Sequence, residues 1–264
     1  MRIVILTSFL KGTAAYHLPS ILENTNVSVT MVVYSEGIVL NKKKMYAKKI
    51  RKVFKIGLLG AINGLRMRRW FNNDIEQYCK IDNIENICEK HDIPFYKVSS
   101  TNSKETQQLF KDANADLGIS LGNGYIGSKV FNIPKYGMIN IHHEILPNYQ
   151  NAQSIIWQLY NGSTNTGYTI HLITSKIDEG NIVYQKIVPI GFKETLPATI
   201  AFTSYKLLEA SAEGLIATLN HFNEFFDNAK PQGEGQSYTT PSYWQYLKIK
   251  KQHDILKKMS FLKA

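Results

Sequence analysis

Cysteine is scarce in this sequence, with only Cys79 and Cys88 among 264 residues. Two cysteines cannot build a disulfide framework or a structural metal cluster, and such a composition is typical of proteins of the reducing cytoplasm. We therefore expect a cytoplasmic protein that holds no metal ion.

Long apolar runs are also missing. Residues 3–10 (IVILTSFL) are too short to span a bilayer and follow a single positive charge. They predict a first buried strand rather than a transmembrane helix or a cleaved signal peptide. No G-x-G-x-x-G sequence follows this strand, which is evidence against a nicotinamide cofactor.

Acidic residues are absent from one long segment. Between Lys42 and Arg69 the sequence has eleven Lys and Arg residues and no Asp or Glu. Because these are 11 of 31 basic residues, the rest of the chain holds 20 basic against 21 acidic residues and is nearly neutral. The net charge of +10 therefore belongs to this segment and not to a general nucleic-acid-binding surface.

Apolar residues interrupt the basic segment at loosely helical spacing: Met45, Ile50, Val53, Phe54, Leu58 and Leu59. Two interpretations stay open for this insert at about residues 40–72. In the first interpretation, residues 42–69 dock on an anionic membrane face or on a phosphorylated substrate. Alternatively, they form an inserted helix whose Lys and Arg side chains are simply solvated.

The remaining sequence alternates between short apolar runs and amphipathic segments, in a chain long enough for a sizeable core. We expect strands at residues 2–7, 27–34, 94–98, 116–121, 138–141, 168–174 and 182–190. We expect helices at residues 14–23, 75–91, 104–111 and 153–160, and a long helix at about 196–222 that Thr195 caps. The aromatic, loop-rich residues 231–251 are expected to form a small hairpin or to lie across a substrate cleft.

Residues 137–180 place polar side chains at the ends of two of these strands. Asn140 and His142 are two positions apart, so they share one face of a strand, whereas His143 leaves the other face. Leu146-Pro147 stops the strand, and the next strand leads to a turn that contains Asp178. The stretch thus offers an amide, an imidazole and a carboxylate near strand ends.

This stretch resembles the formyltransferases that use N10-formyltetrahydrofolate. That family carries Asn-x-His followed by Leu-Pro, and an Asp-x-Gly turn after the next strand. Asn140-Ile141-His142, Leu146-Pro147 and Asp178-Glu179-Gly180 match in order and approximate spacing. The resemblance is close over about residues 115–192 and loose over 1–40. It implies an α/β, Rossmann-like core around a mostly parallel sheet of about seven strands.

The resemblance also implies that Asn140, His142 and Asp178 are catalytic, and their chemistry suits formyl transfer to an amine. The Asn140 amide can donate a hydrogen bond to a developing oxyanion. His142 can accept the amine proton near neutral pH. Asp178 can orient the imidazole or favour its charged form.

Further residues are expected to contact the two substrates. On the folate side the resemblance implies Leu121, Gly122, Asn123, Gly124, Tyr125, Ile145 and Ile177. Two glycines at a strand end let the backbone turn sharply beside a flat ligand. On the acceptor side we expect Lys11, Gly12 and Thr13, in a strand–helix loop where N–H groups can bind a phosphate, although an ordinary turn is equally compatible. Relatives often have Ser at the position of Glu144, whose carboxylate could bind an amino group.

The other histidines have less specific positions. Many relatives have histidine where His171 stands, but a hydrogen-bonded core histidine would suit that strand equally well. His143, on the opposite strand face, is expected to be structural. Trp157 and Trp244 are expected to be core or cleft-wall residues.

We expect a catalytic core over residues 1–192, and a long helix with a C-terminal extension over 193–264. The best fit is a sugar N-formyltransferase, which moves a formyl group from N10-formyltetrahydrofolate to a nucleotide-linked amino sugar, a surface glycan precursor. About 70 residues follow the core, and most of the first 28 look helical, which is too little for the β-barrel of methionyl-tRNA formyltransferases. Glycinamide-ribotide formyltransferases usually lack the basic insert and the aromatic tail.

Partners and alternatives follow from this interpretation. We expect a small-molecule acceptor rather than a nucleic acid, and a homodimer is left open. One alternative is an enzyme like the methionyl-tRNA formyltransferases, which the basic segment favours. Another is a non-catalytic protein that binds folate as a scaffold, against which the intact Asn140, His142 and Asp178 argue.

Overall fold

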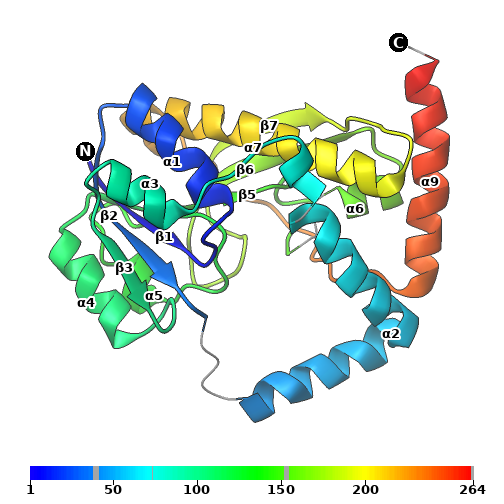
Figure 1. Ribbon diagram of the computed structural model, residues 1–264, viewed down its shortest axis with the longest axis horizontal. Coiled ribbons are helices and arrows are strands. Elements are labelled where there is room, and N and C mark those ends of the chain that lie inside the picture. Colours follow the sequence, from blue (N-terminus) through cyan, green and yellow to red (C-terminus); the bar gives the residue numbers. More distant parts are fainter. Residues whose placement is uncertain (38–41, 73, 152–154, 263–264) are drawn as a thin grey trace.

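One seven-stranded sheet lies at the centre of the computed structural model, which describes residues 1–37, 42–72, 74–151 and 155–262 (Figure 1). The strands are β1 (Arg2–Thr7), β2 (Ser28–Ser35), β3 (Phe95–Val98), β4 (Leu117–Ser120), β5 (Met138–His142), β6 (Asn165–Leu172) and β7 (Ile182–Pro189). Their order is β3-β2-β1-β4-β5-β6-β7, parallel from β3 to β5 and antiparallel from there to β7. This confirms the expected α/β fold with a mostly parallel sheet.

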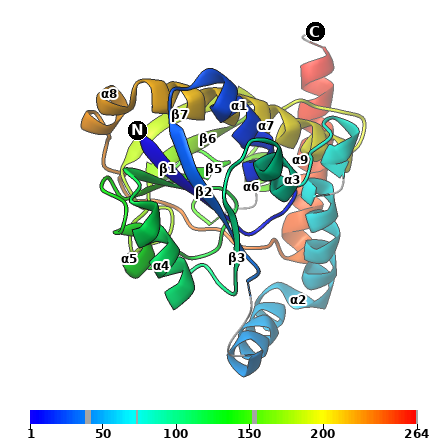
Figure 2. The same ribbon diagram turned by 60° about the vertical axis from the view of Figure 1, so that its left-hand side comes forward.

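Helices cover both faces of the sheet (Figure 2). They are α1 (Thr13–Asn24), α2 (Lys42–Asn72), α3 (Ile84–Lys90), α4 (Lys104–Ala113), α5 (Ser128–Phe131), α6 (Ile156–Tyr160), α7 (Leu196–Asn220), α8 (Phe222–Asp227) and α9 (Tyr243–Phe261), with a 3-10 turn, η1 (Asp74–Gln77). Ile3 and Ile5 of β1 face the core beneath α1, α3 and α7, while Val4 and Leu6 face the smaller core beneath α4 and α5. Because both faces are covered, β1 is a continuous apolar run.

The long helix α7 begins as the sequence predicts, with the Thr195 side chain accepting a hydrogen bond from the Ala198 N–H. Its buried residues join the same core as β1, β5 and β6. The helix ends at Asn220, and a separate short helix, α8, follows it.

The expected helix at 75–91 is wrong. The chain forms the 3-10 turn η1 and, after a break, the short helix α3. Asn83 starts α3 by accepting a hydrogen bond from the Glu85 N–H, so local capping divides a segment whose apolar spacing looks continuous.

The expected hairpin in the C-terminal tail is also wrong. Residues 243–261 form α9, which starts in a capping box between Ser242 and Gln245. Its buried residues Ile249, His253 and Leu256 follow a helical spacing. The loop before α9 does not cross the principal cleft, because it runs beside Gln150 instead.

The basic insert forms α2, in which Gly57 has a non-helical conformation (φ 75°) that divides the helix into two halves. No helix in the described ranges has the length and apolarity that crossing a bilayer requires.

Candidate active site

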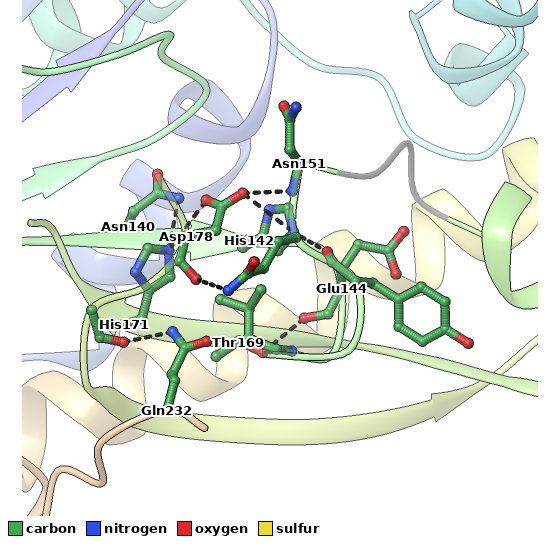
Figure 3. A network of polar contacts seen from close by, with 12 residues as sticks. Asn140, His142, Glu144, Asn151, Thr169, His171, Asp178 and Gln232 are labelled. Atoms are coloured by element: carbon green, nitrogen blue, oxygen red, sulfur yellow. Dashed lines mark hydrogen bonds and ion pairs between the residues drawn. The ribbon is translucent and has the colours of Figure 1, made fainter. Parts of the chain in front are cut away.

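Asn140 and His142 lie at the carboxyl end of β5, on the same face of the strand (Figure 3). The antiparallel register pairs Asn140 with His171 and His142 with Thr169 of β6. Directly paired residues share one face of a sheet, so this register brings His171 beside Asn140. The three side chains therefore belong to one site.

Asp178 reaches the site from the turn after β6, where its backbone is left-handed (φ 57°). The Asn151 N–H donates a hydrogen bond of 2.9 Å to Asp178 Oδ2. Gly180, two residues after Asp178 in the same turn, passes very close to β6. A Cβ at this position would overlap the Leu172 carbonyl oxygen. Gln232 Nε2 holds the same turn through the Gly180 carbonyl oxygen, at 2.6 Å. The carboxylate is thus held by segments that are distant in the sequence.

His142 Nε2 lies 2.9 Å from the Tyr149 carbonyl oxygen. A carbonyl oxygen can only accept, so Nε2 carries the proton and the lone pair of the neutral ring is on Nδ1. Asp178 Oδ2 lies 3.8 Å from the same Nε2. A second proton on His142 would therefore give a cation that faces a carboxylate only 11% exposed.

His171 has the opposite tautomer. Its Nδ1 lies 2.9 Å from the Leu172 carbonyl oxygen and donates to it, so Nε2 accepts the 3.3 Å hydrogen bond from Asn140 Nδ2. Burial lowers the pKa of His171, which keeps the ring neutral and able to accept. His171 thereby holds one Asn140 N–H, which leaves the other N–H for a ligand.

A cleft of about 360 Å³ opens beside Asn140, His142 and Asp178. It lies at the carboxyl ends of β4 and β5, next to the point where the strand order reverses, which is where open α/β sheets bind ligands. Its remaining walls combine apolar side chains and glycines with polar side chains. The first group is Gly122, Gly124, Tyr125, Ile126, Ile141, Ile173 and Ile177, and the second is Ser120, Asn123, Asn151, His171, Thr174 and Lys176.

Most of the residues expected on the folate side line this cleft, but two do not. Leu121 is fully buried in the core beneath the sheet. Ile145 packs over Gly167 of β6, where a Cβ would overlap the Ile145 side chain. Asn123 is held by its own hydrogen bond from Nδ2 to the Leu6 carbonyl oxygen, at 2.6 Å.

A second cleft, of about 290 Å³, lies on the other side of β5. Lys11, Gly12 and Thr13 line it at the start of α1, as does His143. Gly122 lines both clefts, which therefore adjoin at this residue.

His143 confirms the expected opposite orientation, since its Nε2 lies 3.1 Å from Ser211 Oγ of α7. Burial lowers the pKa of His143 to about 4.

The expectation that Glu144 contacts the acceptor is wrong, because its side chain is buried away from both clefts. It is 1% exposed, and neither cleft is lined by it. Gln158 Nε2 donates to its carboxylate, and the Ile155 N–H also contacts it. Burial raises its pKa well above the usual value, because the charged carboxylate is poorly solvated in the core. Among the described residues, no cluster of His, Cys, Asp and Glu is arranged to hold a metal ion.

The sequence did not predict the groups that orient the His142 and Asp178 side chains. They are the Tyr149 carbonyl and the Asn151 N–H, and backbone atoms leave no side-chain signal in a sequence. Gln232 lies far from the site in the chain, and only the tertiary structure brings it to the Asp178 turn.

These features agree with comparison to known families. The model of the formyl transferase family matches residues 1–209, which is most of the chain. The protein therefore belongs to the formyltransferase family.

Individual relatives differ in their acceptors. Methionyl-tRNA formyltransferase from Thermotoga maritima is 31% identical over 159 residues, or 60% of this chain. The match spans 50% of that relative's own length. A sugar N-formyltransferase from Shewanella sp. has a similar structure, with a TM-score of 0.58, 15% identity, and coverage of 96% of this chain and 87% of the other. Phosphoribosylglycinamide formyltransferase from Anaplasma phagocytophilum also has a TM-score of 0.58, with 16% identity and coverage of 91% and 96%. At such identities the likeness shows the fold alone.

Proposed function

We propose that this enzyme transfers the formyl group of N10-formyltetrahydrofolate to the amino group of a nucleotide-linked amino sugar. Family membership gives formyl transfer as the class of reaction. The observation that carries the proposal is the pair of clefts that adjoin at Gly122, one beside Asn140, His142 and Asp178 and the other beside Lys11.

The first cleft suits the folate donor. Ile126, Ile141, Ile173 and Ile177 offer apolar surface to a flat ring, and the neighbouring glycines leave the backbone open to polar contacts. A ring held there would present its formyl group toward Asn140.

The catalytic side chains can then divide the chemistry of the transfer. As the amine nitrogen bonds to the formyl carbon, charge develops on the formyl oxygen, and the Asn140 N–H not used by His171 donates to it. His142 accepts a proton from the amine, and the resulting cation faces Asp178. When the bond from the formyl carbon to N10 breaks, the proton held by His142 passes to N10, His142 returns to its neutral form and tetrahydrofolate leaves.

The second cleft suits a phosphorylated acceptor. The Lys11 ammonium and the first N–H groups of the twelve-residue helix α1 are both favourable partners for a phosphate. Leu207 and Leu208 supply an apolar wall. An acceptor with its phosphates at Lys11 would extend its amine past Gly122 toward His142.

A panel of acceptors tests the proposal. The protein is incubated with N10-formyltetrahydrofolate and, separately, with nucleotide-linked amino sugars, glycinamide ribonucleotide and initiator methionyl-tRNA, and products are detected by the mass gain of one formyl group. We expect formylation of a nucleotide-linked amino sugar. Formylation of the tRNA alone, with a rate that falls steeply as salt rises, would give the protein the function of its Thermotoga maritima relative instead.

The His142→Ala variant is the control for every acceptor. It measures the background formylation that a reactive donor gives without catalysis. If no acceptor is formylated while the folate still binds, the proposed acceptor class is wrong and the alternative of a folate-binding scaffold gains support.

A further inference from the structure

The first half of α2, residues 42–56, extends away from the body of the protein (Figures 1 and 2). Every residue from Tyr46 to Lys55 is exposed. The exposed set includes large apolar side chains, with exposed fractions of 58% for Tyr46, 56% for Ile50 and 85% for Phe54. Only at its end does this half bury an apolar residue, Ile56, so burial does not hold the turns from Tyr46 to Lys55.

The apolar and basic residues of this half lie on opposite faces. Tyr46, Ile50, Val53 and Phe54 recur at intervals of three and four residues, which places them on one side of a helix. Lys48, Arg51, Lys52 and Lys55 follow the same intervals on the other side. An amphipathic helix of this kind normally buries its apolar face, but here that face meets solvent.

The second half of α2 is docked, but only by one face. Gly60 and Gly64 lie against residues 240–242, so closely that a Cβ on Gly64 would come within 2.6 Å of Thr240 Cγ2. The opposite face presents Leu58, Ile62 and Leu65, which are all more than half exposed. The second half of α2 is thus held against the protein, and its outer face presents a second apolar stripe to solvent.

We propose that α2 lies in the surface of an anionic lipid bilayer, with Tyr46, Ile50, Phe54 and Leu58 between the lipid headgroups. Charge complementarity selects this occupant, because eleven basic residues without an acid suit a negatively charged surface. A second copy of the chain is disfavoured as the occupant, since it would bring eleven like charges to the same contact. The structure thereby favours the membrane interpretation of the insert over solvated side chains.

Sedimentation with vesicles tests the proposal. The full-length protein is mixed with vesicles of phosphatidylcholine, with or without phosphatidylglycerol. We expect retention only on the mixed vesicles, and release at high salt, because screening weakens the lysine contacts. Equal binding to both vesicle types, or to neither, would overturn the proposal.

Substitutions separate the apolar contribution from the charge contribution. Phe54→Ser is expected to lower the binding constant about tenfold, since a buried aromatic side chain is lost from the lipid. Ile187→Ser is the matched control, because Ile187 is 64% exposed on β7, away from the helix, and should have no effect. Replacing Lys48, Lys52 and Lys55 together by Gln should lower binding about a hundredfold, at about fivefold for each lysine. Circular dichroism and thermal unfolding check that each variant is folded.

A fluorescent probe reports which face enters the lipid. The probe is Phe54→Trp, combined with Trp244→Phe to remove the emission of the exposed Trp244. With mixed vesicles its emission should shift to the blue, and lipids that carry bromine on their acyl chains should quench it. Lys48→Trp, on the basic face, should show neither change. Emission that changes equally at both positions, or at neither, would contradict insertion of the apolar face.

Two other occupants would give distinct results. A dimer would appear in sedimentation velocity without vesicles and would dissociate in Phe54→Ser. An RNA would bind at low salt, lose affinity in the lysine variant and retain it in Phe54→Ser. Either result, combined with no retention on mixed vesicles, would replace the lipid as the partner.

Discussion

The two histidines of the site carry their protons on different ring nitrogens, and this difference assigns their roles. His142 donates through Nε2 to the Tyr149 carbonyl oxygen, whereas His171 donates through Nδ1 to that of Leu172. The Nε2 atom of His171 consequently accepts from Asn140. This geometry suits His171 to position Asn140, and it leaves Nδ1 of His142 as the atom that would take a proton in the proposed transfer.

The role proposed for His142 predicts a loss of turnover in His142→Ala. Removal of a positioned general base typically costs about a hundredfold or more in kcat, and the affinity for the folate donor should change little. Steady-state rates and donor binding measure the two quantities. His91→Ala, which changes an exposed histidine, should keep the wild-type rate. Near-normal turnover in His142→Ala would remove it from its role.

The position of Lys11 in the second cleft predicts an effect on the acceptor only. Lys11→Ala should raise the acceptor KM about tenfold, the usual order for a lost hydrogen bond to a charged group, and leave the donor KM and kcat nearly unchanged. A phosphate contact that is the same in the ground and transition states affects binding and not turnover at saturation.

The control for this substitution is Lys90→Ala, at the exposed end of α3, where no change is expected. A rise in the donor KM alone would exchange the assignments of the two clefts.

At the scale of elements, the site depends on how β6 passes into the turn that carries Asp178. This turn folds back onto the strand, and Gly180 lies against the backbone of Leu172 with no room for a Cβ. The Asn151 N–H and Gln232 hold the turn from outside. Small shifts of this element therefore move the Asp178 carboxylate, which is catalytic in the proposed mechanism.

Gly180→Ala is expected to disturb both stability and activity. Since the added Cβ would overlap the Leu172 carbonyl, the turn has to move, at a cost of about 2 kcal/mol in the free energy of unfolding. Displacement of Asp178 should also lower kcat. Urea unfolding and initial rates measure the two effects. Gly233→Ala is the matched control, because a Cβ at Gly233 meets nothing within 4 Å. Wild-type values for both quantities would show that the turn tolerates the side chain.

At the scale of the whole molecule, a buried polar cluster links α1, the end of β5 and α7. Ser211 Oγ lies 3.0 Å from Nε2 of His17 and 3.1 Å from Nε2 of His143. Burial lowers the pKa of His17 to about 3 and that of His143 to about 4. Both rings are therefore neutral in the folded protein near neutral pH.

This cluster predicts that the protein loses stability in acid. Because the folded pKa values lie below about 6.5, the unfolded chain binds more protons beneath that pH. The contribution of the two neutral histidines to the free energy of unfolding is complete above about pH 6.5. It falls as the pH drops toward 4, by about 1.4 kcal/mol per pH unit for each histidine. Buried Glu144, whose pKa is raised, acts in the opposite direction.

The measurement therefore compares the wild type with His143→Gln, in which the contribution of Glu144 cancels. The free energy of unfolding is measured with urea at pH 7, 6 and 5. Its slope against pH should be shallower in the variant, by an amount that corresponds to about one bound proton. Identical slopes would mean that the pKa of His143 is the same in the folded and unfolded protein.

Local chemistry in the sequence determined the strands of the sheet and the start of α7, and it singled out the candidate site residues. Continuous apolar runs predict buried parallel strands, and β1 spans Arg2–Thr7 as expected. The spacing of Asn140 and His142 places them on one strand face, and the match to the formyltransferases points to both and to Asp178. These features depend on neighbours along the chain, which is why they can be read before folding.

Only the tertiary structure decided which distant groups meet. The pairing of His171 with Asn140 depends on the β5–β6 register, and a slip of one residue would turn His171 to the other face. Glu144 is adjacent in sequence to the site, yet Gln158 of α6 and the surrounding core draw it away from both clefts. The helix α2 has a sequence that suits either a solvated or a docked helix, and its outward apolar face follows from which face packs against residues 240–242. Periodicity specifies the faces of an element, but what each face meets is decided by packing between elements that are far apart in the chain.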